Sequence, residues 1–552
     1  MSEYGFSPVG VKEAILGDSI EVCADSDRHF VVANSPSLKA EIYAPEINFY
    51  INSTNDEMLQ IARNVEILYE AKAVMFDYGA DNAYQKPVGK NIIFVSDNER
   101  KSSVNALKNA GFKVICLRHA EVKFVYGGIG DLSVSVLNCT DEYEVEADFF
   151  LVENAKSYQL RQSGCYEIAG LNDDEILALV SEKSPIYTYK NNISFNANLC
   201  QYEGRREELC AKCVEVCPSV ALLKDEQNRK LEISHIDCIA CGRCVSICPT
   251  GAISSAKQPP IAISQMAKLY AGKIPLLAHE ASFGEISGVS LPCDVLPFGI
   301  FAKFQLDEIF LLSIMQETGS QIVLFEGEIC EATKDAISLI NSATMAIYGV
   351  QGVFVASNEA QLKTALNLAK SGQKWKFSLN ETNLSKIEIF SSRMAFMVGE
   401  GDYGVIANGS SQSHAKISIN EQTCTLCLSC AGACNTGALF ADKSDNSLKF
   451  NASLCVGCDY CVLSCAEKDT MALDLCGVEL KKEFFEYQIL ARDELFECIE
   501  CGKKFATKKA IMKIANLMSA HFADDADKAK TLFCCADCKA KIMILKQMQE
   551  EI

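Results

Sequence analysis

The sequence predicts a multidomain protein of mixed α/β and α+β class. Three observations lead to this prediction. The chain has 552 residues, which corresponds to roughly three or four domains. Apolar strand-like runs alternate with amphipathic helix-like runs over two long segments, as they do in α/β domains. Two short blocks rich in cysteine interrupt this alternation, and further cysteine pairs lie near the end of the chain.

The charge and the cysteine content exclude several classes of protein. The chain has 72 acidic and 52 basic residues, a net charge of −20, and therefore repels the phosphates of nucleic acids. It has 28 cysteines, but disulfide-stabilised secreted proteins are usually far shorter. We expect no signal peptide and no membrane span, because no basic segment precedes an apolar run and no apolar run reaches about 18 residues. We therefore expect a cytoplasmic protein whose cysteines bind metals or carry redox chemistry.

Residues 1–190 are predicted to form an α/β domain. A helix is expected over 99–111. The expected strands cover residues 91–97, 113–117, 122–138 and 147–154. The segment GGIGDLSVSV, followed by VEADFFLVENA, resembles flavoproteins of the heterodisulfide-reductase type. No G-x-G-x-x-G motif follows a strand, however, so we expect a degenerate nucleotide-binding-like scaffold and keep a flavin site as the alternative.

The two cysteine-rich blocks, within 191–258 and 415–476, are related as an internal repeat. Seven cysteines recur at a constant offset of 217 positions. Those of the first block are Cys210, Cys213, Cys217, Cys238, Cys241, Cys244 and Cys248, and those of the second are Cys427, Cys430, Cys434, Cys455, Cys458, Cys461 and Cys465. The eighth pair breaks the register, because Cys424 corresponds to Glu207 and the nearest unassigned cysteine is Cys200.

The spacing of these cysteines is typical of a 4Fe–4S site. In Cys238-x2-Cys241-x2-Cys244-x3-Cys248-Pro249, three thiolates on one tight loop bind one cluster, and the fourth cysteine ligates the cluster of a partner run. Zinc is the alternative. Structural zinc sites, however, are built from two C-x2-C pairs and not from three clustered cysteines with a distant fourth. Each block resembles bacterial dicluster ferredoxins, and strand–turn–strand patterns over 220–234 and 438–450 agree with a small hairpin beside the clusters.

The resemblance implies two dicluster ferredoxin modules, 191–258 and 415–476, with four 4Fe–4S clusters in the chain. It implies crossed ligation in each module. In the first module the ligand sets are Cys210, Cys213 and Cys248 with Cys200, and Cys238, Cys241 and Cys244 with Cys217. In the second module they are Cys424, Cys427, Cys430 and Cys465, and Cys455, Cys458, Cys461 and Cys434. Whether Cys200 or Glu207 completes the first set stays open at this point.

Residues 259–395 are predicted to form another α/β domain. The expected strands cover 275–279, 289–294, 321–327 and 352–357, and the expected helices cover 304–319, 332–349 and 358–372. Over some of this segment the chain resembles the delta subunit of methyl-viologen-reducing hydrogenases. We expect Cys293 and Cys330 to be buried thiols rather than ligands of a fifth cluster.

Residues 485–552 are predicted to form a zinc-knuckle domain. Cys498-x2-Cys501 and Cys535-x2-Cys538 are two knuckles that would close one four-thiolate site for structural zinc. A single iron of the rubredoxin type and free thiols are the alternatives. Cys534 could substitute for its neighbour. A helix is expected between the knuckles.

The function expected from the sequence is electron transfer by an iron–sulfur protein. The arrangement as a whole resembles the long ferredoxin-type proteins that accompany bacterial formate dehydrogenases, which implies a redox partner protein such as a dehydrogenase or its electron acceptor. The alternatives are a flavin-containing iron–sulfur reductase subunit and a maturation factor that docks on a dehydrogenase. Whether the chain is itself an enzyme stays open, and no catalytic residue is expected.

The charges beside the cluster loops predict a difference between the modules. Arg205, Arg206, Lys212 and Arg243 lie in or beside the loops of the first block, although acidic neighbours partly offset them. The loops of the second block carry Asp459 and neither lysine nor arginine. A nearby cation favours reduction, which adds negative charge. We therefore expect the first module to be the easier one to reduce.

Overall fold

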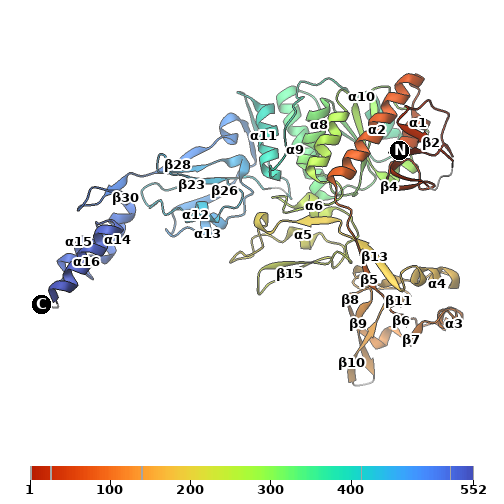
Figure 1. Cartoon of the computed structure of the whole chain (residues 1–552), viewed down its shortest axis with the longest axis horizontal. Helices are drawn as coiled ribbons and strands as arrows, with labels where there is room; N and C mark the ends of the chain where they lie inside the picture. Colours follow the sequence, from red (N-terminus) through yellow and green to blue (C-terminus); the bar gives the residue numbers. More distant parts are fainter. Residues whose placement is uncertain are drawn as a thin grey trace. The chain divides into compact units, whose positions relative to one another are not determined.

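The computed structural model describes residues 3–24, 28–138, 141–286, 288–411, 413–522 and 524–550, and has mixed α/β architecture (Figure 1). It divides into two compact units, and each is described by itself. Residues 1–340 and 351–382 make the first unit, and residues 341–350 and 383–552 make the second. Within the described residues, none of the helices combines the length and the apolar composition needed to cross a bilayer.

The first unit begins with a parallel four-stranded sheet of order β2-β1-β3-β4. Its elements are β1 (Tyr4–Phe6), β2 (Ile20–Val22), β3 (His29–Ala33) and β4 (Lys39–Tyr43), followed by α1 (Pro45–Ser53) and α2 (Met58–Tyr78). Helix α2 packs on α7 (Pro260–Leu269). The buried Lys72 on α2 joins these segments, because its ammonium forms ion pairs with Glu280 and, at 3.1 Å, with Glu46.

A second parallel sheet in this unit has the order β12-β11-β6-β7. Its strands are β6 (Asn91–Val95), β7 (Lys113–Leu117), β11 (Phe149–Val152) and β12 (Cys165–Glu167), with helices α3 (Lys101–Asn109) and α4 (Asp173–Ser181). The expected strand–helix–strand unit is therefore confirmed. The segment expected to be strand over 122–138 is a hairpin of β8 (Val122–Gly128) and β9 (Asp131–Asn138), which β10 (Asp141–Ala147) extends. Strands β5 (Ala83–Pro87) and β13 (Ile186–Lys190) pair separately.

The third parallel sheet of the first unit has the order β19-β18-β20-β21. It consists of β18 (Ile274–His279), β19 (Val295–Ile300), β20 (Ile322–Phe325) and β21 (Val353–Ala356), with helices α8 (Glu308–Thr318), α9 (Glu331–Tyr348) and α10 (Glu359–Leu368). The strand expected over 289–294 is wrong. Leu291 forms only an isolated bridge with Thr54. The chain then turns, with the Val295 N–H donating to the Pro292 carbonyl at 3.0 Å, and the buried strand begins only at Val295.

The two cysteine-rich blocks fold with the same order of elements. In the first, β14 (Ile193–Phe195) pairs with β17 (Ile253–Ser255) around the hairpin β15 (Leu222–Asp225)–β16 (Lys230–Ile233) and helices α5 (Lys212–Glu215) and α6 (Arg243–Ile247). In the second, β23 (Ala415–Ile419) pairs with β26 (Met471–Leu475) around β24 (Leu439–Asp442)–β25 (Ser447–Phe450), α12 (Ser429–Ala433) and α13 (Tyr460–Leu463). The expected hairpins are confirmed.

The rest of the second unit surrounds the second block and ends in the C-terminal cysteine segment. The elements around the block are α11 (Lys386–Val398), the pair β22 (Asp402–Ile406)–β27 (Val478–Lys481), and β28 (Gln488–Arg492), which adds to β25. The C-terminal segment has the hairpin β29 (Leu495–Glu497)–β30 (Lys504–Thr507) and helices α14 (Lys508–Met518), α15 (Ala526–Thr531) and α16 (Ala536–Glu550). The helix expected between the knuckles is α14. The domain boundaries expected from the sequence stay predictions.

Candidate functional site

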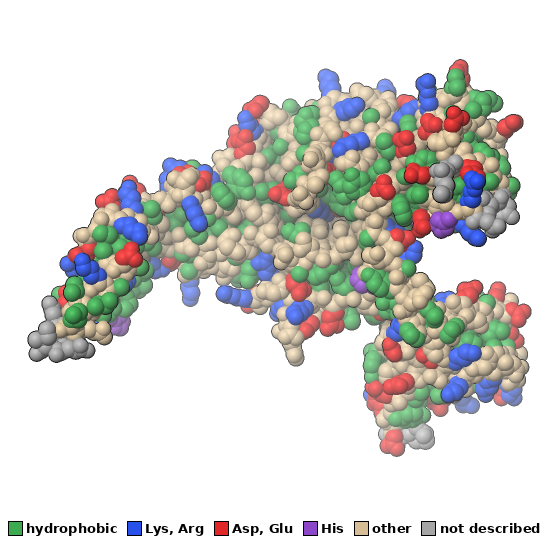
Figure 2. Space-filling model, in the orientation of Figure 1, with side chains coloured by type: hydrophobic (Ala, Val, Ile, Leu, Met, Phe, Trp, Pro, Cys, Tyr) green, Lys and Arg blue, Asp and Glu red, His purple; other side chains and the backbone are tan. Residues whose placement is uncertain are grey.

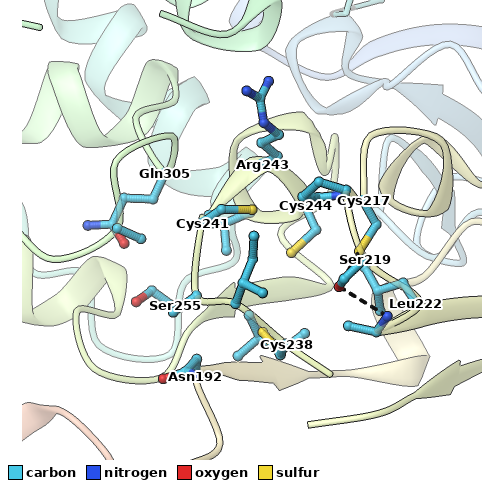
Figure 3. Close-up of a pocket in the computed structure, with 18 of the residues that line it drawn as sticks. Asn192, Cys217, Ser219, Leu222, Cys238, Cys241, Arg243, Cys244, Ser255 and Gln305 are labelled. Carbon is cyan, nitrogen blue, oxygen red and sulfur yellow. Dashed lines mark hydrogen bonds between the residues drawn. The ribbon is translucent and has the colours of Figure 1, made fainter. Parts of the chain in front are cut away.

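Four cysteines of the first block surround one hollow. Figure 3 shows the thiols of Cys217, Cys238, Cys241 and Cys244 around a common space, whereas the side chain of Arg243 points away from it. Cys238 and Cys241 lie on the loop that leads into α6, Cys244 lies in α6 itself, and Cys217 follows α5. The thiols interact, because burial and then the charges of the neighbouring thiols raise the pKa of Cys244 well above its usual value. The resemblance to dicluster ferredoxins implies the same group of four.

The loop after β19 covers this hollow. Phe301, Ala302 and Gln305 contribute to its lining. The Phe304 N–H donates a 2.9 Å hydrogen bond to the Cys241 carbonyl, which fixes the cover on the cysteine loop. These lining residues were missed by the sequence analysis, since they lie more than fifty positions from the cysteines and no local pattern marks them. The cover shields the thiols from water.

Cys200, Cys210, Cys213 and Cys248 line a second hollow in the same block. Cys200 lies at the end of a short helical turn, and its Sγ accepts a hydrogen bond from the Tyr202 N–H at 3.4 Å. Burial and then the nearby charges of Cys248, Cys210 and Cys200 raise the pKa of Cys213. Glu207, the alternative raised by the repeat, is exposed to solvent and lies outside the described lining of this hollow.

The second block brings its cysteines together in two corresponding groups. Burial, opposed by a backbone N–H and assisted by the charges of Cys427, Cys424 and Cys465, raises the pKa of Cys430 to about 12. Burial likewise raises the pKa of Cys455 to about 12, with contributions from Cys458, Cys434 and Cys476. Cys461 interacts with Cys455, Cys458 and Cys434. Each group thus unites three cysteines of one run with one cysteine of the other run.

The backbone explains how three thiols of one run converge. In three of the four cysteine runs, the residue before the second cysteine and the residue after it are both left-handed. The pairs are Ala240 and Gly242, Leu426 and Leu428, and Gly457 and Asp459, with φ between 49° and 83°. Non-glycine residues rarely adopt this conformation, so the backbone of these runs is locally strained. The left-handed residues turn the chain so that three thiols of a run point toward one another. The run that begins at Cys210 is the exception, and Cys200 lines the same hollow as Cys210 and Cys213.

The thiol sets fit 4Fe–4S clusters. Sulfur is the donor that cluster iron prefers. Burial raises the pKa of Cys213, Cys244, Cys430 and Cys455, and bound metal would remove this penalty because it takes the thiolate form. The clusters themselves would supply one-electron redox chemistry when bound.

The C-terminal cysteines form a different, tighter group. The Sγ atoms of Cys498, Cys501, Cys535 and Cys538 all lie within 4.8 Å of one another, and those of Cys501 and Cys535 are 3.7 Å apart. Four sulfurs at about 2.3 Å from a central zinc ion lie about 3.8 Å from one another, so this group has the dimensions of a tetrahedral metal site. The group can therefore bind a metal ion.

The surroundings of this group act on its thiols in different directions. Cys538 lies in the first turn of α16, and the neighbouring Cys501 thiol and burial raise its pKa. Desolvation opposes ionisation of Cys498, but backbone N–H groups, first that of Cys535, outweigh it and lower the pKa of this thiol to about 6. Cys534, the expected substitute, is buried outside the group, and its Sγ lies 3.4 Å from the Lys530 carbonyl.

Two further cysteines were expected to be buried thiols. Cys330 is buried, with its Sγ 3.2 Å from Thr333 Oγ1, as expected. Cys293 is exposed, so the expectation for this residue is wrong. It lies in the turn before β19, where the strand expected over 289–294 does not form.

Comparison with known proteins bears on the first block. Residues 208–252 match the family described as the 4Fe-4S dicluster domain. A search of curated proteins finds no match to the chain. The matched segment therefore has an iron–sulfur electron-transfer role with bound 4Fe–4S, and a ferredoxin-type domain of this kind implies a redox partner.

Proposed function

We propose that this chain is an electron-transfer protein that holds four 4Fe–4S clusters in two dicluster modules, with one zinc ion in the C-terminal segment. The observation that carries the proposal is the matching geometry of the two blocks. Cysteines at the same offsets lie in groups of four, and the same strand pair and hairpin surround them. Only the first block carries the family match, so the second module rests on the repeat and on this geometry.

The chain's own residues position the clusters and exclude water from them. In the first module the clusters would be held by Cys200, Cys210, Cys213 and Cys248, and by Cys217, Cys238, Cys241 and Cys244. In the second they would be held by Cys424, Cys427, Cys430 and Cys465, and by Cys434, Cys455, Cys458 and Cys461. We also propose a reducing compartment such as the cytoplasm, where cysteines stay available to bind metal.

Metal analysis of the full-length protein, purified without oxygen, tests the proposal. We expect about sixteen irons and about one zinc per chain. Cys434→Ser should lose or convert one cluster and change the electron paramagnetic resonance (EPR) spectrum. Cys476→Ser is the matched control, because Cys476 lies near Cys455 but belongs to neither group, and it should leave iron and spectrum unchanged. About eight irons in the wild-type protein would contradict the second module.

We propose a dehydrogenase of the formate-dehydrogenase type as the redox partner, on the strength of the sequence resemblance alone. The visible absorbance of the oxidised protein should bleach when formate and a catalytic amount of such an enzyme are added without oxygen. Because the chain is strongly acidic, the rate of bleaching should fall with added salt. A protein that dithionite reduces but that formate and the enzyme leave oxidised would contradict this partner.

The flavin alternative receives no support from the groove at the carboxyl ends of β6 and β7. This groove has a volume of about 410 Å³, and Asp97 and Glu99 stand in the turn where a dinucleotide site needs glycines beside a pyrophosphate. Arg100, the first cation of this turn, is held by Glu153 at 2.9 Å. Denatured protein should therefore release no fluorescent cofactor.

A further inference from the structure

The C-terminal cysteine segment is attached to one ligand loop of the second module. At the end of β30, Thr507 Oγ1 donates a 2.9 Å hydrogen bond to the carbonyl of Thr425, the residue after Cys424. From the second residue of α14, Lys509 Nζ donates a 2.6 Å hydrogen bond to the carbonyl of Glu421. The start of α14 therefore lies directly on the loop that carries Cys424.

A second contact joins α14 to the other end of the same cysteine group. Lys513 forms an ion pair with Glu467, which follows Cys465 by two residues. Glu467 also accepts a 3.0 Å hydrogen bond from Thr425 Oγ1. The cysteine group of Cys424 and Cys465 is therefore bracketed by two lysines of one helix.

These lysines add positive charge beside cysteine runs, 424–434 and 455–465, that contain neither lysine nor arginine. Glu467 adds a carboxylate two residues after Cys465, and Lys513 forms an ion pair with this carboxylate. Residues 495–552 contain ten lysines against eight carboxylates in a chain of net charge −20, and Figure 2 shows Lys and Arg side chains over α14–α16, at the lower left.

The metal-binding group is linked to this helix through a short path. Cys498 and Cys501 lie in the turn of the β29–β30 hairpin, and β30 runs without a break into α14 (Figure 1). Phe505 on β30 packs against the core of the C-terminal cysteines. Metal binding that orders this hairpin therefore also fixes the first residues of α14.

We propose that the C-terminal segment is a positioning device, which holds Lys509 and Lys513 beside the cluster of Cys424, Cys427, Cys430 and Cys465 and raises the reduction potential of that cluster. The inference rests on the proposed function, because it assumes a cluster in this group. A nearby cation stabilises the reduced, more negative state. The expectation that the first module is easier to reduce considered only the cluster loops, and α14 offsets that difference.

The test is a potentiometric EPR titration of the full-length protein. Lys509→Met should shift the midpoint of one cluster to a lower potential and leave the other three unchanged. Lys509→Arg should retain the wild-type midpoint. Lys528→Met is the matched control on α15, where Lys528 pairs with Asp525 at 3.3 Å, and it should shift no midpoint. An unshifted Lys509→Met protein with full iron content would overturn the inference.

A double substitution distinguishes an electrostatic role of Lys513 from a purely structural one. Lys513→Met leaves the charge of Glu467 uncompensated and should lower the same midpoint. Adding Glu467→Gln should return the midpoint toward the wild-type value, which a purely structural role of Lys513 does not predict. An unrescued double variant would overturn the electrostatic role of Lys513.

Removal of the metal tests the link to α14. Cys501→Ser should lose zinc, retain iron, and lower the same midpoint as Lys509→Met. Zinc loss with an unchanged midpoint would overturn the positioning role of the metal. Wild-type protein without the iron of the second module would instead contradict the proposed function, so the two failures are distinguishable.

Discussion

The N–H of Phe304 donates a 2.9 Å hydrogen bond to the carbonyl of Cys241. This bond ties the loop after β19 to a cysteine run that precedes it by some sixty residues. The contact is close, because a Cβ atom at Gly242 would lie 2.8 Å from Gln305 N and 3.0 Å from Ala302 Cβ. Gly242 also has a φ of 83°. Glycine at this position thus serves both the turn and the close approach of the cover.

Gly242→Ala is expected to loosen the cover over Cys217, Cys238, Cys241 and Cys244. The substitution adds left-handed strain and overpacking, together roughly 2–4 kcal/mol. Amide hydrogen exchange around Phe304 should become faster by about tenfold or more. Gly204→Ala is the matched control, because Gly204 has a φ of 66° with open space around it. It should cost about 1 kcal/mol and leave exchange at Phe304 unchanged. Equal effects of the two substitutions would contradict the close approach.

Cys200→Ser is expected to strip or convert one cluster of the first module. Cys200 lines the same hollow as Cys210, Cys213 and Cys248, and a thiolate suits cluster iron better than a carboxylate. Glu207→Gln should leave iron content and EPR spectrum unchanged, since Glu207 is exposed. A lost cluster in Glu207→Gln, with an unchanged Cys200→Ser spectrum, would reverse the assignment.

The grouping of the cysteines could be predicted from the sequence because it depends on local spacing. A C-x2-C-x2-C run places three thiols on one loop, and the resemblance to dicluster ferredoxins implies that the two runs of a block each supply the fourth thiol of the other. The register failed only at Glu207, and a loop of a few more residues lets Cys200 reach the group at small entropic cost. The glycines at 242 and 457 are the sequence signal of the left-handed turns within the runs.

The surroundings of the cysteines could not be predicted in this way. Gln305 and Lys509 reach their cysteine groups through contacts between segments that lie about sixty or more residues apart in the sequence. Such contacts depend on how sheets and helices pack, and no periodicity or motif at either residue encodes them. The same reason explains the strand missed before β19, where Pro292 and a turn replaced an apolar run that reads as extended.

Arg243→Met is expected to lower the reduction potential of the cluster next to Cys241. The guanidinium lies 3.9 Å from the ring centroid of Phe304 and pairs with Glu328 at 3.0 Å. The substitution removes the interaction of this cation with the reduced cluster. After solvent screening this interaction is worth on the order of 1 kcal/mol, or roughly 40 mV for one electron. Glu328→Gln should shift the same midpoint upward, because it frees the charge of Arg243. Potentiometric EPR measures both, and shifts of equal sign would contradict this account.

His414 is expected to make the second unit less stable as the pH falls below about 6.5. Its ring stacks on Phe390 at 5.1 Å, and Nδ1 is buried without a hydrogen-bond partner among the described residues. Burial, and then the charge of Lys386, lowers the pKa of His414 to about 4. The unfolded chain binds a proton at a higher pH than the folded one, so stability is full above the unfolded pKa and declines between about 6.5 and 4, by at most about 1.4 kcal/mol per pH unit.

His414→Gln separates this effect from the general acid sensitivity of the protein. The variant lacks the titrating group, so its amide hydrogen exchange in the segment around His414 should change less between pH 7 and pH 5, after correction for intrinsic exchange rates, than that of the wild-type protein. The His414 N–H donates to Asn408 Oδ1 at 2.7 Å, and its carbonyl accepts from the Cys476 N–H at 3.1 Å. Both bonds belong to the backbone of residue 414 and survive the substitution. An identical pH dependence in the two proteins would show that His414 ionises in the folded state as it does in the unfolded chain.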